Sequence, residues 1–361
     1  MVNLIDCDME YFLDYVKDKR IVAFGAGKKF KKFISDYSLV DKIEFVVDNN
    51  KEKQGKYVLV EGREIFICSI EELANIYNYG MVIVITNATS FIAIMDQLNG
   101  IKKLDEAECF YSYYMEERCH HERIEYTKGA QKIPKIIHYC WFGKSLFPKR
   151  FEECIETWHN FLPEYEFKKW DESNYDIGKN LYMKEAYQEG KYGFVPDFAR
   201  LDIVYEYGGI YLDVDIEVVK SFDDLLNDDA FFGFNSYGSI NLGCGFGAKK
   251  GDELICKLKN HYIEKHFVVD EGEPLTCVAY QAPIFRDYGF ILNNKQQCVR
   301  GHMLYPMEVF APKGQLNLVN LQSNHTHSIH HSALTWANKQ SMKGMIELKE
   351  KGSSYIKSYR R

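Results

Sequence analysis

The chain has 361 residues, of which 46% are apolar and 27% are charged, a balance typical of globular proteins with a sizeable core. At roughly 150 residues per domain this length predicts two domains, and the net charge of −7 argues against general nucleic-acid binding, which requires a basic surface. The ten cysteines are dispersed without a C-x-x-C pair, and no apolar run is long enough to cross a bilayer. We therefore expect reduced thiols, no secretory leader and a cytoplasmic protein.

The first 130 residues alternate between strand and helix patterns. Short apolar runs occur at 20–27, 42–50, 64–68 and 81–86, and helical spacing of apolar residues follows at 28–39 and up to about residue 99. Ser69 and Glu72 form a capping-box signature that predicts a helix start after the third run. Such alternation predicts a parallel sheet with right-handed crossovers, so we expect a Rossmann-like α/β domain over residues 1–130.

A glycine turn follows the first of these strands. Gly25 and Gly27 stand where a backbone can approach a phosphate at a helix N-terminus, and Asp48 ends the next strand, where an acid can hold a ribose. The third glycine position of the dinucleotide pattern is Phe30, which weakens close packing against a pyrophosphate. Two interpretations stay open: a ligand site at Gly25, Gly27 and Asp48, or a Rossmann-like scaffold that binds no dinucleotide.

A polar stretch at 115–132 is expected to be a helix and a linker, which places the domain boundary near residue 130. The second domain, 131–361, begins with the apolar run KIPKIIHYCWFG. Helical patterns follow at 149–161 and 180–190, and the segment PDFARLDIVYEY then leads into two glycines.

Two aspartates separated by one valine lie in the apolar run YLDVDIEV. In a strand, residues two apart share a face, so Asp213, Asp215 and Glu217 would point one way. By periodicity alone this is the wet acidic face of a half-buried strand. The neighbourhood favours a second interpretation, because Asp197 and Arg200 would share one helix face just upstream. Two carboxylates beside an arginine are suited to hold a divalent cation and ligand oxygens while a diphosphate departs.

From residue 131 to about 336 the chain resembles glycosyltransferase family 32, which has a DXD sugar-binding region. Four segments carry the resemblance, in the family's order: KIPKIIHYCWFG, FLPEYEFKKWDESNYD, FVPDFARLDIVYEYGGIYLDVDIEV and SIHHSALTW. The resemblance implies an α/β domain of the GT-A type with a mixed sheet. The segment EPLTCVAYQAP departs from the T-G-P element that the family often has, so we infer no acceptor residue from it.

The resemblance also implies the residues of a donor site and a retaining reaction without a protein nucleophile. Asp213 and Asp215 would hold Mn²⁺ or Mg²⁺ together with His330. Asp197 and Arg200 would bind hydroxyls of the donor sugar. The other expected donor-binding residues are Trp141 near the base, Thr335 and Trp336 in a loop closing on the diphosphate, and His138, Gly208, Gly209 and Tyr211.

Several of these positions have a plainer interpretation. Trp141 follows an apolar strand and would then belong to the core, and Trp336 would only anchor a helix. The histidines of NHTHSIHH would form a solvated loop or, less in keeping with the absence of nearby cysteines, a zinc site; His331 rather than His330 is the alternative ligand. The segment NLGCGFG at 241–247 is either a flexible loop near the acceptor or a turn between strands.

We therefore expect a retaining transferase that moves a hexose from a UDP-linked donor to a surface polysaccharide, such as a capsule, or to a glycolipid at the inner face of the membrane. The basic, aromatic C-terminus GSSYIKSYRR is the segment that suits peripheral membrane contact. Two other functions stay open. One is an NAD-dependent sugar-nucleotide oxidoreductase or epimerase run by the N-terminal domain, although no Tyr-x-x-x-Lys stands in a matching context. The other is a non-catalytic subunit that binds sugar nucleotides.

Overall fold

The computed structural model describes residues 1–87, 90–118, 123–143, 145–270, 273–274, 277–314, 316–333 and 339–359. The chain divides into two compact units. The N-terminal unit comprises Met1–His120, Leu316–Val319 and Lys339–Arg361, and the second unit comprises His121–Gln315 and Asn320–Asn338. Within the described ranges, no helix combines the length and the apolar character needed to cross a membrane.

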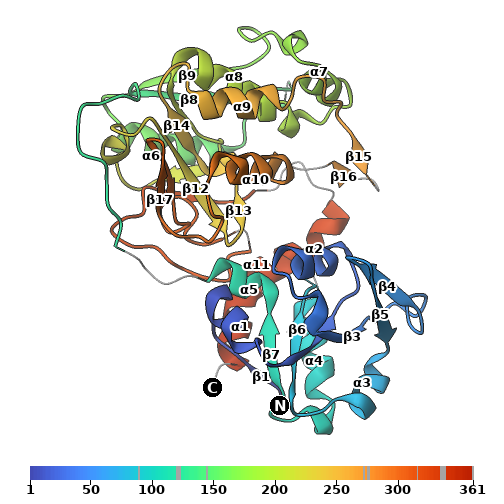
Figure 1. Ribbon diagram of the computed structural model, residues 1–361. Coiled ribbons are helices and arrows are strands. Elements are labelled where there is room, and N and C mark those ends of the chain that lie inside the picture. Colours follow the sequence, from blue (N-terminus) through green and yellow to red (C-terminus); the bar gives the residue numbers. More distant parts are fainter. Residues whose placement is uncertain are drawn as a thin grey trace. The chain divides into compact units, whose positions relative to one another are not determined.

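The N-terminal unit is built on a seven-stranded sheet with the order β1-β7-β6-β2-β3-β5-β4 (Figure 1). Its strands are β1 (Asn3–Leu4), β2 (Arg20–Phe24), β3 (Ile43–Val47), β4 (Tyr57–Val60), β5 (Arg63–Cys68), β6 (Met81–Ile85) and β7 (Glu108–Tyr111). Neighbouring strands run parallel except β4, which pairs antiparallel with β5. The parallel sheet expected from the alternating pattern is confirmed, whereas β1, β4 and β7 were not foreseen.

Six helices in the described ranges belong to this unit: α1 (Met9–Tyr15), α2 (Lys28–Asp36), α3 (Ile70–Ile76), α4 (Phe91–Asn99), α5 (Ser112–Glu117) and α11 (Lys339–Tyr359). The capping box is confirmed, because Ser69 Oγ accepts from the Glu72 N–H at 3.2 Å and Glu72 Oε2 accepts from the Ser69 N–H at 2.7 Å.

The C-terminal helix α11 joins the N-terminal unit, where it packs beside α4 and β1. The expected second domain ran to residue 361 and so included this helix. Its apolar side chains Leu348 and Ile356 are buried. An amphipathic helix docks wherever its apolar stripe finds a matching surface, and position in the sequence does not determine which surface that is.

The second unit is built on a mixed sheet with the order β17-β18-β12-β14-β10-β8-β9 and with β13 attached to β12. Its strands are β8 (Ile136–Cys140), β9 (Glu166–Trp170), β10 (Gly209–Tyr211), β12 (Ala230–Ser236), β13 (Ser239–Ile240), β14 (Phe246–Ala248), β17 (Gln297–Val299) and β18 (His302–Tyr305). The strands β9, β8 and β10 are parallel, whereas β14 runs antiparallel to both of its neighbours. The α/β class with a mixed sheet, expected for this part of the chain, is confirmed.

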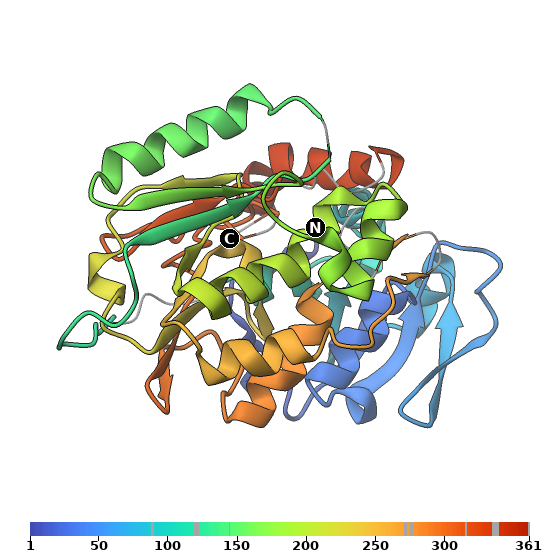
Figure 2. The same cartoon turned by 90° about the horizontal axis from the view of Figure 1, so that it is seen from above.

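Helices cover both faces of this mixed sheet: Figure 2 shows α6 (Lys149–Phe161) over one face and α8 (Pro196–Tyr207) with α9 (Glu253–Asn260) over the other. The strand period explains the division, because Ile137 of β8 joins Trp158 of α6 in one core while His138 points the opposite way, toward the end of α8. The remaining α-helices and strands of this unit are α7 (Leu181–Gln188), α10 (Cys277–Tyr288), the pair β11 (Ile216–Val218) and β19 (Ser328–His330), and the pair β15 (Val269–Asp270) and β16 (Glu273–Pro274).

Candidate active site

Asp213 and Asp215 lie in a turn and not in a strand. β10 ends at Tyr211, the Ile216 N–H donates to the Asp213 carbonyl at 3.1 Å, and the chain resumes as β11. The continuous strand expected across both aspartates is therefore wrong. β10 belongs to the mixed sheet, whereas β11 pairs with β19 in a separate two-stranded sheet. Alternation of residue types cannot reveal this, because it carries no information on which partner strand each half will find.

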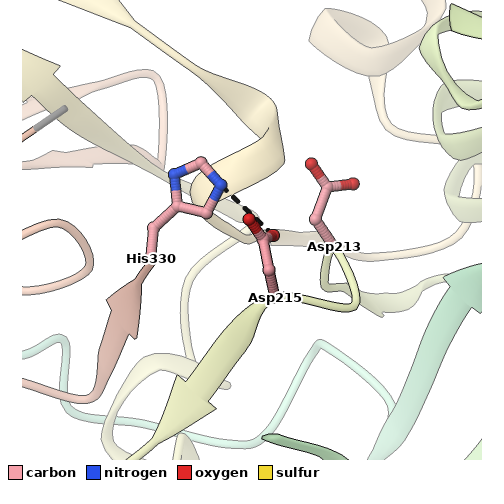
Figure 3. A group of neighbouring side chains, drawn as sticks. All are labelled: Asp213, Asp215 and His330. Carbon is pink, nitrogen blue, oxygen red and sulfur yellow. Dashed lines mark ion pairs between the residues drawn. The ribbon is translucent and has the colours of Figure 1, made fainter. Parts of the chain in front are cut away.

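Asp213, Asp215 and His330 gather at one point (Figure 3). Their ligand atoms all lie within 4.8 Å of one another. The antiparallel register of β11 and β19 sets His330 opposite Ile216, and His330 Nε2 lies 3.4 Å from Asp215 Oδ1. Two carboxylates and an imidazole form a donor set that a divalent cation accepts. The adjacent His331 turns elsewhere, with Nε2 3.0 Å from Glu217 Oε2.

Asp215 stays ionised although it is buried. Burial alone would raise the pKa of Asp215, but the charge and hydrogen bond of His330 and the Ala333 N–H, 2.7 Å from Oδ2, hold that pKa well below its usual value. Burial lowers the pKa of His330, while Cys244 and Asp215 raise it to a value well above its usual one. A cation in the cluster would therefore compete with a proton for the imidazole.

Asp197 and Arg200 lie three residues apart on α8, and both are almost fully buried. Arg200 Nη2 donates to Asp197 Oδ1 at 3.2 Å, Nε donates to the Pro196 carbonyl at 3.0 Å, and Nη1 lies 3.5 Å from Asp213 Oδ1. Burial raises the pKa of Asp197 to about 6, because the nearby Arg200 only partly offsets desolvation and the charge of Asp213 adds to it. Arg200 thus links Asp197 on the same helix to Asp213 in the aspartate turn. The expected proximity of Asp197 and Arg200 to the DXD aspartates is seen in this contact.

The sequence of this region matches a described family. Residues 148–232 match the family described as glycosyltransferase sugar-binding region containing DXD motif. Residues 148–232 are thus similar to a DXD glycosyltransferase region. The match includes two of the four segments on which the resemblance rests, those at 161–176 and 194–218.

Curated relatives match parts of the chain. Inositol phosphoceramide mannosyltransferase 3 of Schizosaccharomyces pombe is 32% identical over 165 residues, which cover 44% of this chain and 45% of that protein. Subversion of eukaryotic traffic protein A of Legionella pneumophila is 27% identical over 185 residues, which cover 42% of this chain and 28% of that protein. Among solved structures, PaToxG Glycosyltransferase has a TM-score of 0.31 at 20% identity, covering 37% of this chain and 61% of that one. The chain thus spans less than half the length of these two curated relatives.

Glycines shape the entrance to the DXD region. Gly208 (φ +67°) ends α8, and Gly209 (φ +103°) starts β10, where a Cβ would lie 2.7 Å from the Ile136 carbonyl oxygen. Tyr211 OH donates to Asp213 Oδ1 at 2.9 Å, and the Arg200 guanidinium lies 4.8 Å from the centre of the Tyr211 ring. These three residues position the DXD aspartates, and the direct donor contact expected of them stays a prediction.

His138 supports the chain just before the DXD region through a hydrogen bond to Gly208. Its Nε2 lies 2.8 Å from the Gly208 carbonyl and its Nδ1 accepts from Trp170 Nε1 at 3.2 Å, so both ring nitrogens already have protein partners. Burial lowers its pKa to about 4. The ring thus supports the DXD region through its own hydrogen bonds, and the donor contact expected of His138 stays a prediction.

Trp141 lies just beyond β8 and is only partly buried. Its ring packs edge-on against Phe147 at 4.8 Å, and its Nε1 donates to the Ser145 carbonyl at 3.1 Å. This is not a core position, and the accessible ring keeps the expected stacking of a base on Trp141 as a prediction. Thr335 and Trp336, expected to close on the diphosphate, lie outside the described residues.

The segment at 241–247 contributes two residues that sequence reasoning did not assign. An added Cβ on Gly243 would lie 2.4 Å from Asp213 Oδ2, so only glycine fits beside that carboxylate. Cys244 Sγ lies 3.3 Å from His330 Nδ1, on the opposite side of the imidazole from Asp215. The only available signal was the density of glycines in NLGCGFG, which indicates close backbone approach but not to what.

In the N-terminal unit, Gly25, Gly27 and Asp48 come together at the carboxyl ends of β2 and β3. Asp48 Oδ2 accepts from the Ala26 N–H at 2.8 Å and Oδ1 accepts from the Asn50 N–H at 2.8 Å. In a dinucleotide-binding fold this carboxylate would bind a ribose, whereas here Asp48 accepts hydrogen bonds from the backbone of the glycine turn and of its own loop. This geometry favours the interpretation of a scaffold without a bound dinucleotide.

Proposed function

We propose that the chain is a metal-dependent glycosyltransferase that moves a hexose from a nucleotide sugar to a surface-polysaccharide or glycolipid acceptor, with retention of configuration. UDP is the nucleotide proposed, and the activity is assigned to the domain that begins near residue 131, acting at the cytoplasmic face of the membrane. The observation that carries the proposal is the Asp213–Asp215–His330 cluster beside the buried Asp197–Arg200 pair. A cation site for a diphosphate thus adjoins a pair suited to sugar hydroxyls.

The relatives support the class of reaction. One of them is named as an inositol phosphoceramide mannosyltransferase, which supports a hexosyl donor and a glycolipid acceptor for this chain. GDP-mannose therefore belongs beside the UDP-sugars among the donors to test.

The cluster would hold the cation through Asp213, Asp215 and His330. When bound, the cation neutralises charge that develops on the departing diphosphate. The imidazole in the donor set favours a transition metal such as Mn²⁺ over Mg²⁺, which prefers oxygen ligands. Asp197 accepts hydrogen bonds from donor-sugar hydroxyls, and Arg200 donates them.

The exchange of bonds takes place on one face of the sugar. The bond from the anomeric carbon to the phosphate oxygen breaks, and the nucleotide leaves with the electron pair. The acceptor oxygen bonds to the anomeric carbon from the same face, and its proton passes to the leaving phosphate oxygen. Arg200 is held by Asp197 and by the Pro196 carbonyl. It therefore keeps the sugar in place during the bond exchange without a rearrangement of its own side chain.

The experiment measures nucleotide release from UDP-glucose, UDP-galactose, UDP-N-acetylglucosamine and GDP-mannose, with Mn²⁺, with Mg²⁺ and with EDTA. The purified chain is compared with Asp215→Asn and with Glu217→Gln, a matched control two residues away whose carboxylate pairs with His331. We expect EDTA and Asp215→Asn to lower release at least about 100-fold, since a metal supplies several kcal/mol to charge stabilisation. Glu217→Gln should stay within about twofold of wild type.

Three results would overturn the proposal. They are no metal-dependent release from any of the four donors, full activity of Asp215→Asn, and release that persists unchanged in EDTA. The first would also favour a non-catalytic binding subunit if UDP still bound in the presence of Mn²⁺.

A further inference from the structure

The loop that leads from β8 into α6 carries an apolar side chain that projects into solvent. Leu146 is 95% exposed, the highest fraction among the large apolar side chains that the structure describes. The loop is held on both sides of its turn, because Glu172 Oε1 accepts from the Gly143 N–H at 2.7 Å and Trp141 Nε1 donates to the Ser145 carbonyl at 3.1 Å. Single exposed leucines are common on protein surfaces, so the neighbours of Leu146 decide whether it has a role.

Aromatic rings surround the base of this loop. Phe147 packs edge-on against Trp141 with ring centres 4.8 Å apart, and both rings lie 5.9 Å from the ring of Phe151. Tyr192, which is 40% exposed, covers the backbone of Gly143, where an added Cβ would lie 2.4 Å from the tyrosine ring. Four residues of this surface are partly or largely exposed, and we refer to them as the apolar rim: Trp141, Leu146, Phe147 and Tyr192.

Positive charge borders the apolar rim. Residues 141–151 read WFGKSLFPKRF, which contains three basic residues and no acid. Lys149 and Arg150 begin α6 and are exposed, and the acids of α6 follow only at Glu152 and Glu153. Glu153 Oε1 lies 4.0 Å from Lys149 Nζ, at the limit of an ion pair, and both side chains stay largely exposed. Such a pair contributes little, so the charge of Lys149 remains available to an anionic surface.

The apolar rim starts at the same edge of the mixed sheet as the aspartate turn. β8 and β10 are neighbouring parallel strands in which Tyr211 stands opposite His138, and the Leu212 N–H donates to the His138 carbonyl at 3.0 Å. The carboxyl ends of parallel strands meet at one edge of a sheet. The loop after β8 and the turn after β10 therefore leave the sheet side by side, and Figure 2 shows the loop running on from there into α6.

The apolar side chain of the C-terminal segment is used differently. Ile356, within GSSYIKSYRR, is 1% exposed and is thus packed inside the protein. A lipid contact at the C-terminus could not use Ile356, whereas Leu146 can enter a lipid surface without any loss of packing.

We propose that the apolar rim, together with Lys149 and Arg150, is a membrane-contact surface that inserts Leu146 into the headgroup region of an anionic bilayer. Leucine and aromatic residues beside lysine and arginine are the composition of protein segments that lie at a membrane interface. Burial of Leu146 supplies the hydrophobic part of the binding, and the two basic residues supply the electrostatic part. The contact with lipid follows from the surface alone. Its purpose, to bring the headgroup of a glycolipid acceptor beside the DXD aspartates, rests on the proposed function.

The test measures sedimentation of the purified chain with vesicles, in the absence of nucleotide sugar and metal. One set of vesicles is pure phosphatidylcholine, and the other contains one quarter phosphatidylglycerol. We expect wild type to bind the anionic vesicles and Leu146→Asn to bind them at least about tenfold more weakly, since a leucine side chain is no longer buried. The double variant Lys149→Gln, Arg150→Gln should lose the preference for anionic vesicles, because each basic side chain near such a surface contributes about fivefold in affinity.

Controls separate this surface from a general effect of the substitution. Leu59→Asn makes the same change at a leucine of β4 that is 58% exposed and lies in the N-terminal unit, and it should sediment as wild type does. Leu146→Asn should keep the melting temperature of wild type and its rate of nucleotide release without vesicles, because the exposed side chain makes little packing contact.

Failure of wild type to bind anionic vesicles would overturn the inference, and so would equal binding by Leu146→Asn. In the first case, light scattering that shows a dimer for wild type and a monomer for Leu146→Asn would reassign the apolar rim to a second copy of the chain. Vesicle binding is measured without a donor, whereas the proposed function is measured by nucleotide release. Failure of one is therefore distinguishable from failure of the other.

Discussion

Gly243 and Cys244 show how single residues tune the aspartate cluster without being ligands themselves. Gly243 leaves room for the Asp213 carboxylate, and Cys244 contacts the face of His330 that points away from Asp215. Both come from a short 3-10 turn, Leu242–Cys244, that is remote in sequence from His330. The missing Cβ of Gly243 therefore matters to the site as much as the thiol of Cys244 does.

We predict that Gly243→Ala lowers metal-dependent nucleotide release at least about tenfold. The new methyl group would lie 2.4 Å from Asp213 Oδ2, so the carboxylate must move away from its partners in the cluster. Gly80→Ala is a suitable comparison, because its Cβ would meet only Asn78 Oδ1 at 3.9 Å and should leave release unchanged. Wild-type activity in Gly243→Ala would contradict the geometry described for Asp213.

A second prediction concerns the imidazole. If Nε2 of His330 binds the cation, Nδ1 carries the proton and donates it to Cys244 Sγ or to Ser332 Oγ, each 3.3 Å away. Cys244→Ala removes one of these two acceptors and should weaken Mn²⁺ binding about tenfold in titration calorimetry. Cys109→Ala, at a buried cysteine on β7 of the N-terminal unit, should leave Mn²⁺ affinity unaltered. Unchanged affinity in Cys244→Ala would show that Ser332 alone orients the ring.

At the scale of elements, the aspartate turn is held between two sheets. β10 anchors one end in the mixed sheet, and β11 anchors the other by pairing with β19. Helix α6 fastens β11 in turn, because Trp158 Nε1 donates to the Ile216 carbonyl at 2.7 Å and Thr157 Oγ1 accepts from the Val218 N–H at 2.9 Å. The turn can hold its carboxylates in fixed positions because both of its ends are tied to buried structure.

Trp158→Phe should therefore lower the free energy of unfolding by about 2–4 kcal/mol. The change leaves the Ile216 carbonyl without its donor and leaves a cavity where the larger ring was. Urea denaturation followed by circular dichroism measures the loss. Trp170→Phe, in which a partly exposed ring loses a hydrogen bond to His138, should cost less. A loss below about 1 kcal/mol for Trp158→Phe would mean that α6 does not fasten β11.

Across the whole molecule, stability is linked to pH through buried histidines of the second unit. His327 donates from Nδ1 to the Ser221 carbonyl at 2.6 Å and lies 3.2 Å from the Tyr126 hydroxyl. Burial first, and the charge of Lys220 second, lower its pKa to about 4. An unfolded histidine titrates near pH 6.5, so below that pH the unfolded chain takes up a proton that the folded chain does not. The stability contributed by the neutral ring is complete above about pH 6.5 and is lost as the pH falls toward 4.

We predict that His327→Gln loses less stability on acidification than wild type does. Between pH 7.5 and 4.5 the difference should be about 2 kcal/mol, the linkage expected for one group of this kind. Urea denaturation of both proteins at the two pH values gives the comparison, and other titrating groups cancel in it. His159→Gln, at an exposed ring, serves as the control. Parallel pH dependence of wild type and His327→Gln would show that His327 does not remain neutral in the fold.

Local patterns were sufficient for much of this protein. Apolar spacing predicted the helix at 149–161, whose bounds α6 reproduces, and the parallel strands before it. The residues Asp197, Arg200, Asp213 and Asp215 were available from their motif, because the order of residue types within some twenty positions is written directly in the chain. Each of these features depends on neighbours close in sequence, and that is the range over which side-chain period and capping act.

Tertiary structure decided what lies far apart along the chain. It ended the expected strand at the aspartate turn and set His330 beside Asp215 and His331 beside Glu217. It also gave α11 to the N-terminal unit. These outcomes follow from pairing and packing between segments tens to hundreds of residues apart. A one-residue shift in the register of β19 would exchange the two histidines, and no local pattern records that register.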